Sequence, residues 1–559
     1  MKRLLTIGMA TAALSLVGLV GAQWWFAQRA ERLALAAESV FVTTGEPALI
    51  SPPETFKPIQ GDVFFVTSLD FQKRTHFAVN RFRREPFEPV LAMYGEHAVA
   101  QLDFPGRDGR YRIWADVFRR KKVTGKIVAI VDEEPTGSVE LVGEENRWTR
   151  VTLVESANIP FRAEFSLRVE KASAGALIGQ LTFERLGDLK PETRPVRLTR
   201  GPMVQSVTET SAVLTWETNV ASDERVEFGP TSQLGFVGES AKQVRYHSAK
   251  LSGLEPGREY FYRIIGNGTK LTEGLSFRTN KPAGQPFRFV VFGDSGVGSK
   301  EQRAIAVQVE AAQPDFIVHT GDLIYGAGER MNYLKGFFEP YGKTITRVGF
   351  YPSLGNHDIG TDYGRPYLDT FVLPENGPPS LTRERNYWFE YGDALFIAVE
   401  SNAPDWRITE VIAPWLEETI RASTKKWKFV YFHHPPYQAG ARAEADPDSL
   451  KTRRHLTPVF ERTLPSMVFV GHDHYYARLR PIGGVRYIVT GAGGAPLYEK
   501  KHDYGVNEIF YNKRHSFTVV DIDGDLLTLT QINDKGELVD KYEQTADRKI
   551  AASVPAGTN

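Results

Sequence analysis

The chain has 559 residues, and this length predicts three or four domains rather than one hydrophobic core. Hydrophobic residues make up 42% and charged residues 24%, an ordinary globular composition that excludes a disordered or fibrous chain. Lysine plus arginine and aspartate plus glutamate both total 68, so no net charge favours nucleic acid or an anionic membrane surface as a partner. The absence of cysteine excludes disulfides, thiolate metal sites and cysteine nucleophiles.

The N-terminus carries a charge-free apolar segment. Residues 4–27 follow a basic start and are long enough to span a bilayer. The aromatic run at 24–26 favours an uncleaved membrane anchor, whereas the small residues at 20–22 suit cleavage of a signal peptide. Residues 1–39 are therefore expected to be a signal peptide or an N-terminal membrane anchor. Either one predicts an exported protein, periplasmic or extracellular.

Two all-β sandwiches are expected after this segment. Residues 41–195 contain stretches in which apolar and polar residues alternate, such as 109–117, as half-buried strands do. This sandwich is expected to be a spacer or to contact a glycan. In residues 196–280 the alternation returns at 212–216, and the stretch 254–262 (LEPGREYFY) leads into a strand as the tyrosine corner of a fibronectin type III sandwich does.

From residue 286 to 546 the pattern changes to short apolar runs that alternate with helical stretches. The runs are almost continuously apolar, as strands buried on both faces are, and they predict a layered α/β domain. Apolar periodicity predicts helices over 300–312, 331–341 and 450–464, and a further helix with Pro414 as its first residue.

Five of these apolar runs end in residues that can bind metal ions. In chain order the motifs GDSG, GDLIY, GNHD, HHPP and GHDH follow the runs 287–292, 316–320, 350–354, 427–432 and 467–470. Ligands of open α/β domains bind beyond the carboxyl ends of the strands. Carboxylate, imidazole and phenolate groups suit first-row metals without a soft ligand. Seven such side chains are too many for one ion with an open position, but they suit two ions that share a carboxylate, as in two-metal phosphatases.

The alternative interpretation is a set of scattered turn residues and core histidines. Gly-Asp occurs six times in the chain, so a single Gly-Asp carries no information. A single Gly-Asn-His or Gly-His-x-His also arises by chance in some chains of this length. Five motifs in one order, each behind an apolar run, indicate a metal site instead.

The motif order GDxG, GDxxY, GNHD, VxxH and GHxH resembles that of the purple acid phosphatases, within the calcineurin-like metallophosphoesterases. With the fibronectin-like unit the resemblance covers roughly residues 196–545. It implies a catalytic β-sandwich flanked by helices, with two metal ions. The resemblance implies that iron(III) binds to Asp294, Asp322, Tyr325 and His474. It implies that iron, zinc or manganese binds to Asp322, Asn356, His433 and His472.

Further residues are expected around these ligands. The resemblance places His357 at the substrate, as a phosphate contact, as a proton donor to the leaving alcohol, or as a residue that orients its neighbours. His434 is predicted to contact phosphate or to pack beside a ligand. His319 and Asp358 are expected to support the ligands, and Arg454 is expected to face solvent rather than phosphate.

The expected function is hydrolysis of small phosphomonoesters by an exported acid phosphatase. The metals are expected to generate a bound hydroxide that attacks phosphorus, and iron(III) implies an acidic optimum. A phosphodiesterase or nucleotide pyrophosphatase on the same site is the first alternative, because loops such as 326–349, 359–386 and 437–450 decide the substrate. A non-catalytic, glycan-binding cell-surface protein is the second alternative.

Overall fold

The computed structural model comprises two units, residues 1–51 and 52–559. It describes residues 59–555 apart from short gaps at 60, 69–70, 72, 76, 82–88, 94–97, 120–124, 133, 142–145, 162, 171–175, 191–194, 441–444, 502–504 and 548–549. The predicted signal peptide or anchor, residues 1–39, lies outside the described residues. Among the described residues, no helix is long and apolar enough to cross a membrane.

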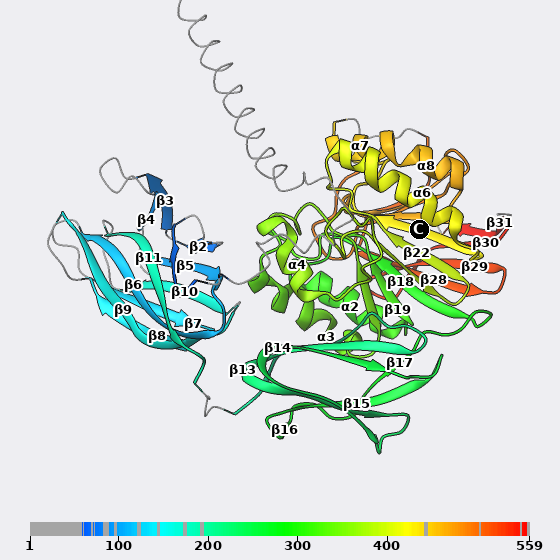
Figure 1. Cartoon of the computed structure of the whole chain (residues 1–559). Coiled ribbons are helices and arrows are strands. Elements are labelled where there is room, and N and C mark those ends of the chain that lie inside the picture. Colours follow the sequence, from blue (N-terminus) through cyan, green and yellow to red (C-terminus); the bar gives the residue numbers. More distant parts are fainter. Residues whose placement is uncertain are drawn as a thin grey trace, which may run out of the picture. The chain divides into compact units, whose positions relative to one another are not determined.

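The first β domain is a sandwich of two antiparallel sheets (Figure 1). One sheet has the order β3-β4-β11-β6-β9, with β1 beside β11, and the other has the order β2-β5-β10-β7-β8. Every second side chain of β6 is buried, as Tyr111 and Ile113 show, and points into one apolar core. The predicted all-β architecture is confirmed. Its strands are β1 (Val63–Val66), β2 (Lys73–Thr75), β3 (Phe77–Arg81), β4 (Pro89–Met93), β5 (Ala98–Asp103), β6 (Gly109–Arg119), β7 (Lys126–Val131), β8 (Glu134–Glu140), β9 (Trp148–Ile159), β10 (Glu164–Glu170) and β11 (Ala176–Gly187).

The second β unit has the strand order β12-β13-β15-β16, with β14 beside β13 and β17 beside β15. Trp216 and Tyr262 are among the buried side chains of its core. The hydroxyl of Tyr260 accepts a hydrogen bond from the backbone N–H of Glu255 at 3.0 Å, which is the contact that a tyrosine corner makes. Its strands are β12 (Leu198–Gln205), β13 (Ser211–Gly229), β14 (Phe236–Ser252), β15 (Glu259–Gly266), β16 (Thr269–Lys270) and β17 (Leu275–Arg278).

The remaining strands form two seven-stranded sheets. The first sheet has the order β20-β19-β18-β28-β29-β30-β31, and β18, β19 and β20 run parallel. The second has the order β21-β22-β23-β24-β26-β25-β27, with a parallel centre of β22, β23, β24 and β26. The strands are β18 (Phe287–Phe292), β19 (Phe316–His319), β20 (Gly349–Pro352), β21 (Tyr387–Tyr391), β22 (Ala394–Ala398), β23 (Trp427–Phe432), β24 (Met467–Val470), β25 (Tyr476–Leu479), β26 (Tyr487–Thr490), β27 (Asn507–Tyr511), β28 (Ser516–Asp523), β29 (Leu526–Asn533), β30 (Leu538–Thr545) and β31 (Ile550–Pro555).

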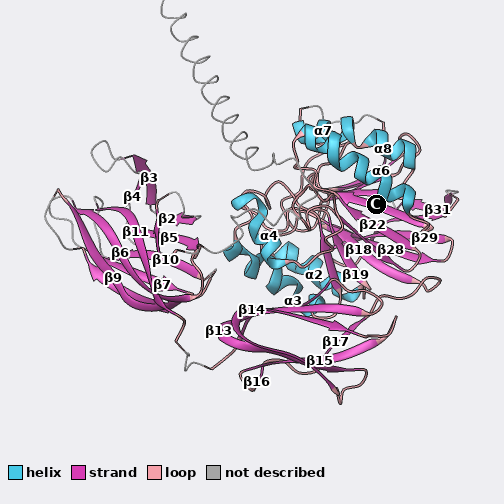
Figure 2. Ribbon diagram, viewed as in Figure 1, coloured by secondary structure: helices cyan, strands magenta, loops and turns pink. Residues whose placement is uncertain are grey.

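Aromatic side chains hold these two sheets face to face. The ring centroid of Phe289 in the first sheet lies 4.9 Å from that of Phe396 and 5.2 Å from that of Phe429 in the second. On the other face of β18, the ring centroid of Phe292 lies 5.5 Å from that of Tyr341 in α3 (Glu339–Ile345). Helices α6 (Ala413–Ala422) and α8 (Thr457–Thr463) pack on the far face of the second sheet in a separate apolar cluster. The domain is therefore the predicted β-sandwich flanked by helices (Figure 2).

Two helices differ from the sequence prediction. The helix predicted over 450–464 is two helices, α7 (Pro447–His455) and α8 (Thr457–Thr463), because Pro458 has no N–H for a continuous helix. The segment 331–341 is likewise broken into short turns before α3, whose first turn contains a proline. The other helical elements are α2 (Lys300–Ala311), η2 (Arg330–Asn332), η3 (Leu334–Phe338), α3 (Glu339–Ile345), η4 (Asp362–Gly364), α4 (Arg365–Thr370), α5 (Asp405–Arg407), η5 (Ile408–Ile412) and α6 (Ala413–Ala422).

A largely buried ion pair joins the second β unit to the domain with the two seven-stranded sheets, and it predicts an effect of pH on stability. Arg330 donates to the Glu217 carboxylate at 2.7 Å. Burial alone would raise the pKa of Glu217, but the charges of Arg330 and Arg200 outweigh it and lower the pKa from 4.5 to about 2. A depressed carboxyl pKa stabilises the folded chain above the unfolded pKa. This contribution, at most about 3 kcal/mol, is lost as the pH falls from 4.5 towards 2.

Thermal unfolding of the wild type and Glu217→Gln at pH 7 and pH 3 tests this expectation. The wild type should have the higher midpoint at pH 7, and the gap should shrink at pH 3 as Glu217 takes up a proton. An equal difference between the two unfolding midpoints at pH 7 and pH 3 would contradict the expected role of the Glu217 carboxylate.

Candidate metal centre

The five predicted motifs lie at the carboxyl ends of neighbouring parallel strands. Asp294, Asp322 and Asn356 follow β18, β19 and β20 of the first sheet, and His433 and His472 follow β23 and β24 of the second. Because the two sheets stack, these ends meet. Ligand atoms of Asp294, Asp322 and His433 lie within 4.8 Å of one another, although they come from both sheets.

Backbone conformation turns three of these side chains toward one another. Asp294, Asp322 and His472 have φ values of 57°, 55° and 68°, in the left-handed region that non-glycine residues rarely adopt. Each of them directly follows a glycine at the end of its strand. Strained backbone of this kind is typical of sites where function fixes the direction of a side chain.

Gly355 of the GNHD motif lies where two loops approach each other closely. A Cβ atom on Gly355 would lie 2.1 Å from Oδ1 of Asp322 and 2.2 Å from its backbone nitrogen. The GNHD loop therefore approaches the GDLIY loop more closely than any side chain at residue 355 would allow.

The first set of donor atoms comes from Asp294, Tyr325 and His474. The Tyr325 hydroxyl lies 2.8 Å from Nε2 of His474 and 3.3 Å from Oδ1 of Asp294. The same Oδ1 lies 3.4 Å from Nε2 of His474. The other carboxylate oxygen of Asp294 accepts the backbone N–H of His472 at 2.9 Å, which fixes the carboxylate plane. Two oxygen atoms and one nitrogen atom that can each bind a metal ion thus face one point.

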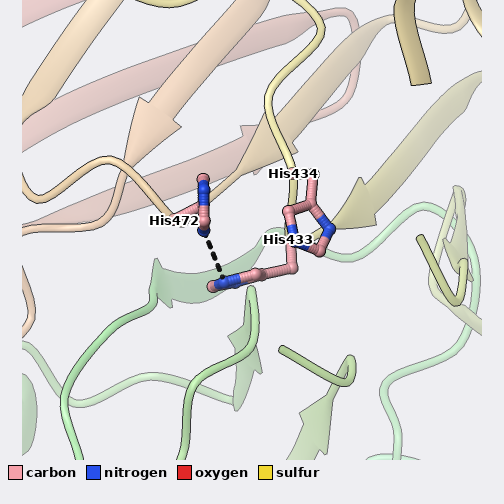
Figure 3. A group of neighbouring side chains, drawn as sticks. All are labelled: His433, His434 and His472. Carbon is pink, nitrogen blue, oxygen red and sulfur yellow. Dashed lines mark hydrogen bonds between the residues drawn. The ribbon is translucent and has the colours of Figure 1, made fainter. Parts of the chain in front are cut away.

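The second set comes from Asp322, Asn356, His433 and His472. Nε2 of His433 lies 3.0 Å from Oδ1 of Asn356 and 3.3 Å from Oδ2 of Asp322. Nδ1 of His472 lies 3.1 Å from the Asn356 oxygen and 3.2 Å from Nε2 of His433 (Figure 3). Asp322, the predicted shared ligand, has its Oδ1 held by the backbone N–H of His357 at 2.9 Å.

The three imidazoles fit a metal centre because each has its second nitrogen fixed. Nδ1 of His433 donates to the Thr320 carbonyl at 2.9 Å, and Nδ1 of His474 donates to the Pro496 carbonyl at 2.7 Å. Nε2 of His472 lies 2.9 Å from Oδ2 of Asp446. Donation from the rear nitrogen leaves a lone pair on the front nitrogen, which is the tautomer that a metal needs. The chemistry of both donor sets therefore suits bound first-row metal ions.

The charges of the centre favour a cation. Burial alone would lower the pKa of His433, but Asp322 and Asp294 outweigh it and raise the pKa to about 10. Burial, followed by the charges of Asp294 and Asp322, raises the pKa of Tyr325 well above its ordinary value. A proton on His433 thus supplies positive charge that a metal ion would replace, since metal binding to such ligands releases protons.

The two predicted supporting residues hold the ligand loops. Asp358 is buried and accepts backbone N–H groups of Leu323, Ile324 and Gly355 at 3.2, 3.1 and 2.9 Å. It joins the GDLIY loop to the GNHD loop. His319 is also buried, and its Nε2 lies 3.0 Å from the Ser295 hydroxyl. Their positions match the expected supporting roles.

The other three predicted residues, His357, His434 and Arg454, lie in different surroundings. His357 is half-buried beside Tyr325, at a ring distance of 4.5 Å, and its Nδ1 donates to the Gly326 carbonyl at 2.8 Å. His434 is buried, and its Nδ1 lies 2.8 Å from the Ser401 hydroxyl, so the ring packs against the ligand histidines. This position agrees with the packing alternative, and phosphate contact by His434 stays a prediction. Arg454 is 66% exposed, as expected, and pairs with Asp405 at 3.4 Å.

Sequence reasoning missed Asp446 and Tyr498. Asp446 contacts His472, and the Tyr498 ring stacks on His474 at a centroid distance of 4.0 Å. The sequence Asp-Pro-Asp-Ser at 446–449 is a helix-start signal that could have placed Asp446 at an N-cap. No local pattern could have indicated its partner, because the contact is made across two loops.

Two parts of this chain match models of known protein families. Residues 287–476 match the family model of the calcineurin-like phosphoesterases, and residues 201–279 match that of the purple acid phosphatase N-terminal domain. The chain thus carries a calcineurin-like phosphoesterase domain behind a purple acid phosphatase N-terminal domain. These two matches support a metal-dependent phosphoesterase domain, and membership of the purple acid phosphatase family would imply a dinuclear metal centre.

Two curated relatives and one solved structure are similar to parts of this chain. An uncharacterised protein of Mycobacterium tuberculosis is 26% identical over 330 residues, which cover 49% of this chain and 60% of the relative. Purple acid phosphatase 21 of Arabidopsis thaliana is 25% identical over 293 residues, 49% of this chain and 63% of the relative. The chain therefore spans less than two thirds of these relatives. The purple acid phosphatase from yellow lupin seeds shares the fold, with a TM-score of 0.56 at 16% identity over 89% of this chain and 99% of the lupin chain.

Proposed function

We propose that the chain is an exported phosphatase that hydrolyses small phosphomonoesters with two metal ions. The observation that carries this proposal is the pair of donor sets whose three histidines each keep the second nitrogen fixed. The free ring nitrogens of these three histidines face carboxylate, phenol and amide oxygens. Packing in a hydrophobic core does not require such an arrangement. The family matches in residues 201–279 and 287–476 support the same function.

The proposed ions are iron(III) in the first set and iron, zinc or manganese in the second. The Tyr325 phenol beside Asp294 and His474 supports iron(III), because a hard oxygen donor suits that ion. When bound, such ions acidify water and neutralise charge on the phosphoryl oxygens of a substrate. The chain itself contributes the Asp322 carboxylate, which the His357 N–H holds in place between the sets.

His357 is the proposed proton donor. Its Nδ1 donates to the Gly326 carbonyl, and the other ring nitrogen, Nε2, does not take part in that hydrogen bond. The ring is half-buried beside Tyr325 and adjoins the donor sets, where a leaving oxygen would need a proton. His434 is a proposed phosphate contact, and the Ser401 hydroxyl holds its Nδ1.

Export, the substrate class and the role of the first β domain rest on sequence reasoning alone. The apolar segment 4–27, the proposed signal or anchor, lies outside the described residues. A phosphodiesterase or nucleotide pyrophosphatase is the alternative reaction on the same metal centre. Glycan contact through residues 41–195 stays a prediction, and no nucleic acid partner is expected.

A visible spectrum tests the proposed iron site together with the activity. Purified chain should contain two metal ions, iron among them, show a broad tyrosinate band and cleave a chromogenic monoester faster than a diester. Tyr325→Phe should lose the band because the phenolate donor is gone. Two metals without the band would remove iron(III) from the proposal. No bound metal and no hydrolysis after reconstitution with iron, zinc and manganese would overturn the enzyme function.

A further inference from the structure

An acidic residue outside the five motifs reaches one of the predicted metal ligands. Oδ2 of Asp446 lies 2.9 Å from Nε2 of His472, and both side chains are only 7% exposed. The opposite nitrogen of the same ring, Nδ1, faces Asn356 and His433 in the second donor set. His472 therefore bridges Asp446 and the metal centre.

The other two ligand histidines use backbone carbonyls for the same purpose. Backbone carbonyls hold the rear nitrogens of these rings, that of Thr320 for His433 and that of Pro496 for His474. His472 instead depends on a side chain that belongs to another loop. A carboxylate is also a stronger acceptor than a carbonyl, and it raises the basicity of the front nitrogen.

Asp446 is itself held rigidly at the start of helix α7. It is the N-cap residue, and its Oδ1 accepts the backbone N–H of Asp448 at 3.3 Å. The Ser449 hydroxyl donates to Oδ2 at 2.8 Å. The nearby cation Lys451 pairs with Asp448 at 2.5 Å. The Asp446 carboxylate is thus positioned by the helix start and directed at His472.

We propose that Asp446 is a positioning residue of the metal centre, which fixes the orientation and tautomer of His472 for the second metal ion. The start of α7, which lies within the 437–450 segment, is then part of the metal site. This inference rests on the proposed two-metal function.

Asp446→Ser is the sharpest variant for a test. Serine is a good N-cap, so helix α7 keeps its start, but its short side chain lacks the carboxylate that reaches His472. Full-length protein is stripped of metal with a chelator and titrated with Zn²⁺. Wild type should bind two ions. Asp446→Ser should bind the first ion as the wild type does and the second about 10-fold to 100-fold more weakly.

Two further variants separate positioning from a general effect on the fold. Asp446→Asn keeps an oxygen that can accept from Nε2, so it should recover part of the affinity that Asp446→Ser loses. Arg454→Ala removes a charge from the same helix, α7, at a side chain that is 66% exposed and pairs with Asp405, so this variant should bind both ions normally. Wild-type affinity for both ions in Asp446→Ser would overturn the inference. Failure of the wild type to bind two ions would overturn the proposed function, and the inference with it.

Discussion

Replacement of Asp322 with alanine is expected to reduce phosphate-ester hydrolysis by about 10³-fold or more and to remove one metal ion. Asp322 lies between the two donor sets, with Oδ2 3.3 Å from Nε2 of His433, and it is within 4.8 Å of a ligand atom of Asp294. A metal ion contributes several kcal/mol of stabilisation to a phosphoryl transition state. Loss of about 4 kcal/mol corresponds to about 10³ in rate.

Metal content by elemental analysis, together with the rate of chromogenic monoester hydrolysis, measures this effect. Asp525→Ala is the matched control, because Asp525 also follows a glycine but is 76% exposed and pairs with Lys426 instead. The control should keep both ions and full activity. Two bound ions and a rate within about tenfold of wild type in Asp322→Ala would show that Asp322 is not the shared ligand.

Replacement of Arg478 with methionine is expected to destabilise the protein by about 3–5 kcal/mol. Arg478 in β25 of the second sheet forms a two-point ion pair with Asp540 in β30 of the first, at 2.7 and 3.1 Å. The side chains are 1% and 0% exposed. Without the guanidinium, the Asp540 carboxylate would be left buried and uncompensated, with only the Tyr476 hydroxyl as a donor among these residues.

Thermal unfolding of three variants tests this expectation. Arg303→Ala breaks an ion pair with Glu339 in which the side chains are 45% and 46% exposed, so it should cost at most about 1 kcal/mol. The double variant Arg478→Met with Asp540→Leu should recover much of the lost stability, because Asp540 no longer leaves a buried charge without a partner and Arg486 still pairs with Glu508. If Arg478→Met cost no more than Arg303→Ala, the buried pair would not hold the sheets together.

Particular elements show why the sequence predicted much of the metal centre. Residues that follow parallel strands gather at one edge of a sheet, so the order of the five motifs was enough to bring Asp294, Asp322 and Asn356 together. Hydrophobic periodicity located the strands because their side chains are buried on both faces. Helix boundaries were less accurate, since Pro458 starts α8 within one apolar pattern.

The sequence by itself determined the kinds of ligand, their order along the chain and the strands that carry them. Only the tertiary structure decided that two separate sheets supply the ligands, because the stacking of Phe289 on Phe396 and Phe429 is a contact between distant segments. It also decided which nitrogen of each histidine faces the centre and that Asp446 holds His472. Hydrogen bonds depend on distance and direction in space, and the local pattern of residues specifies neither of them.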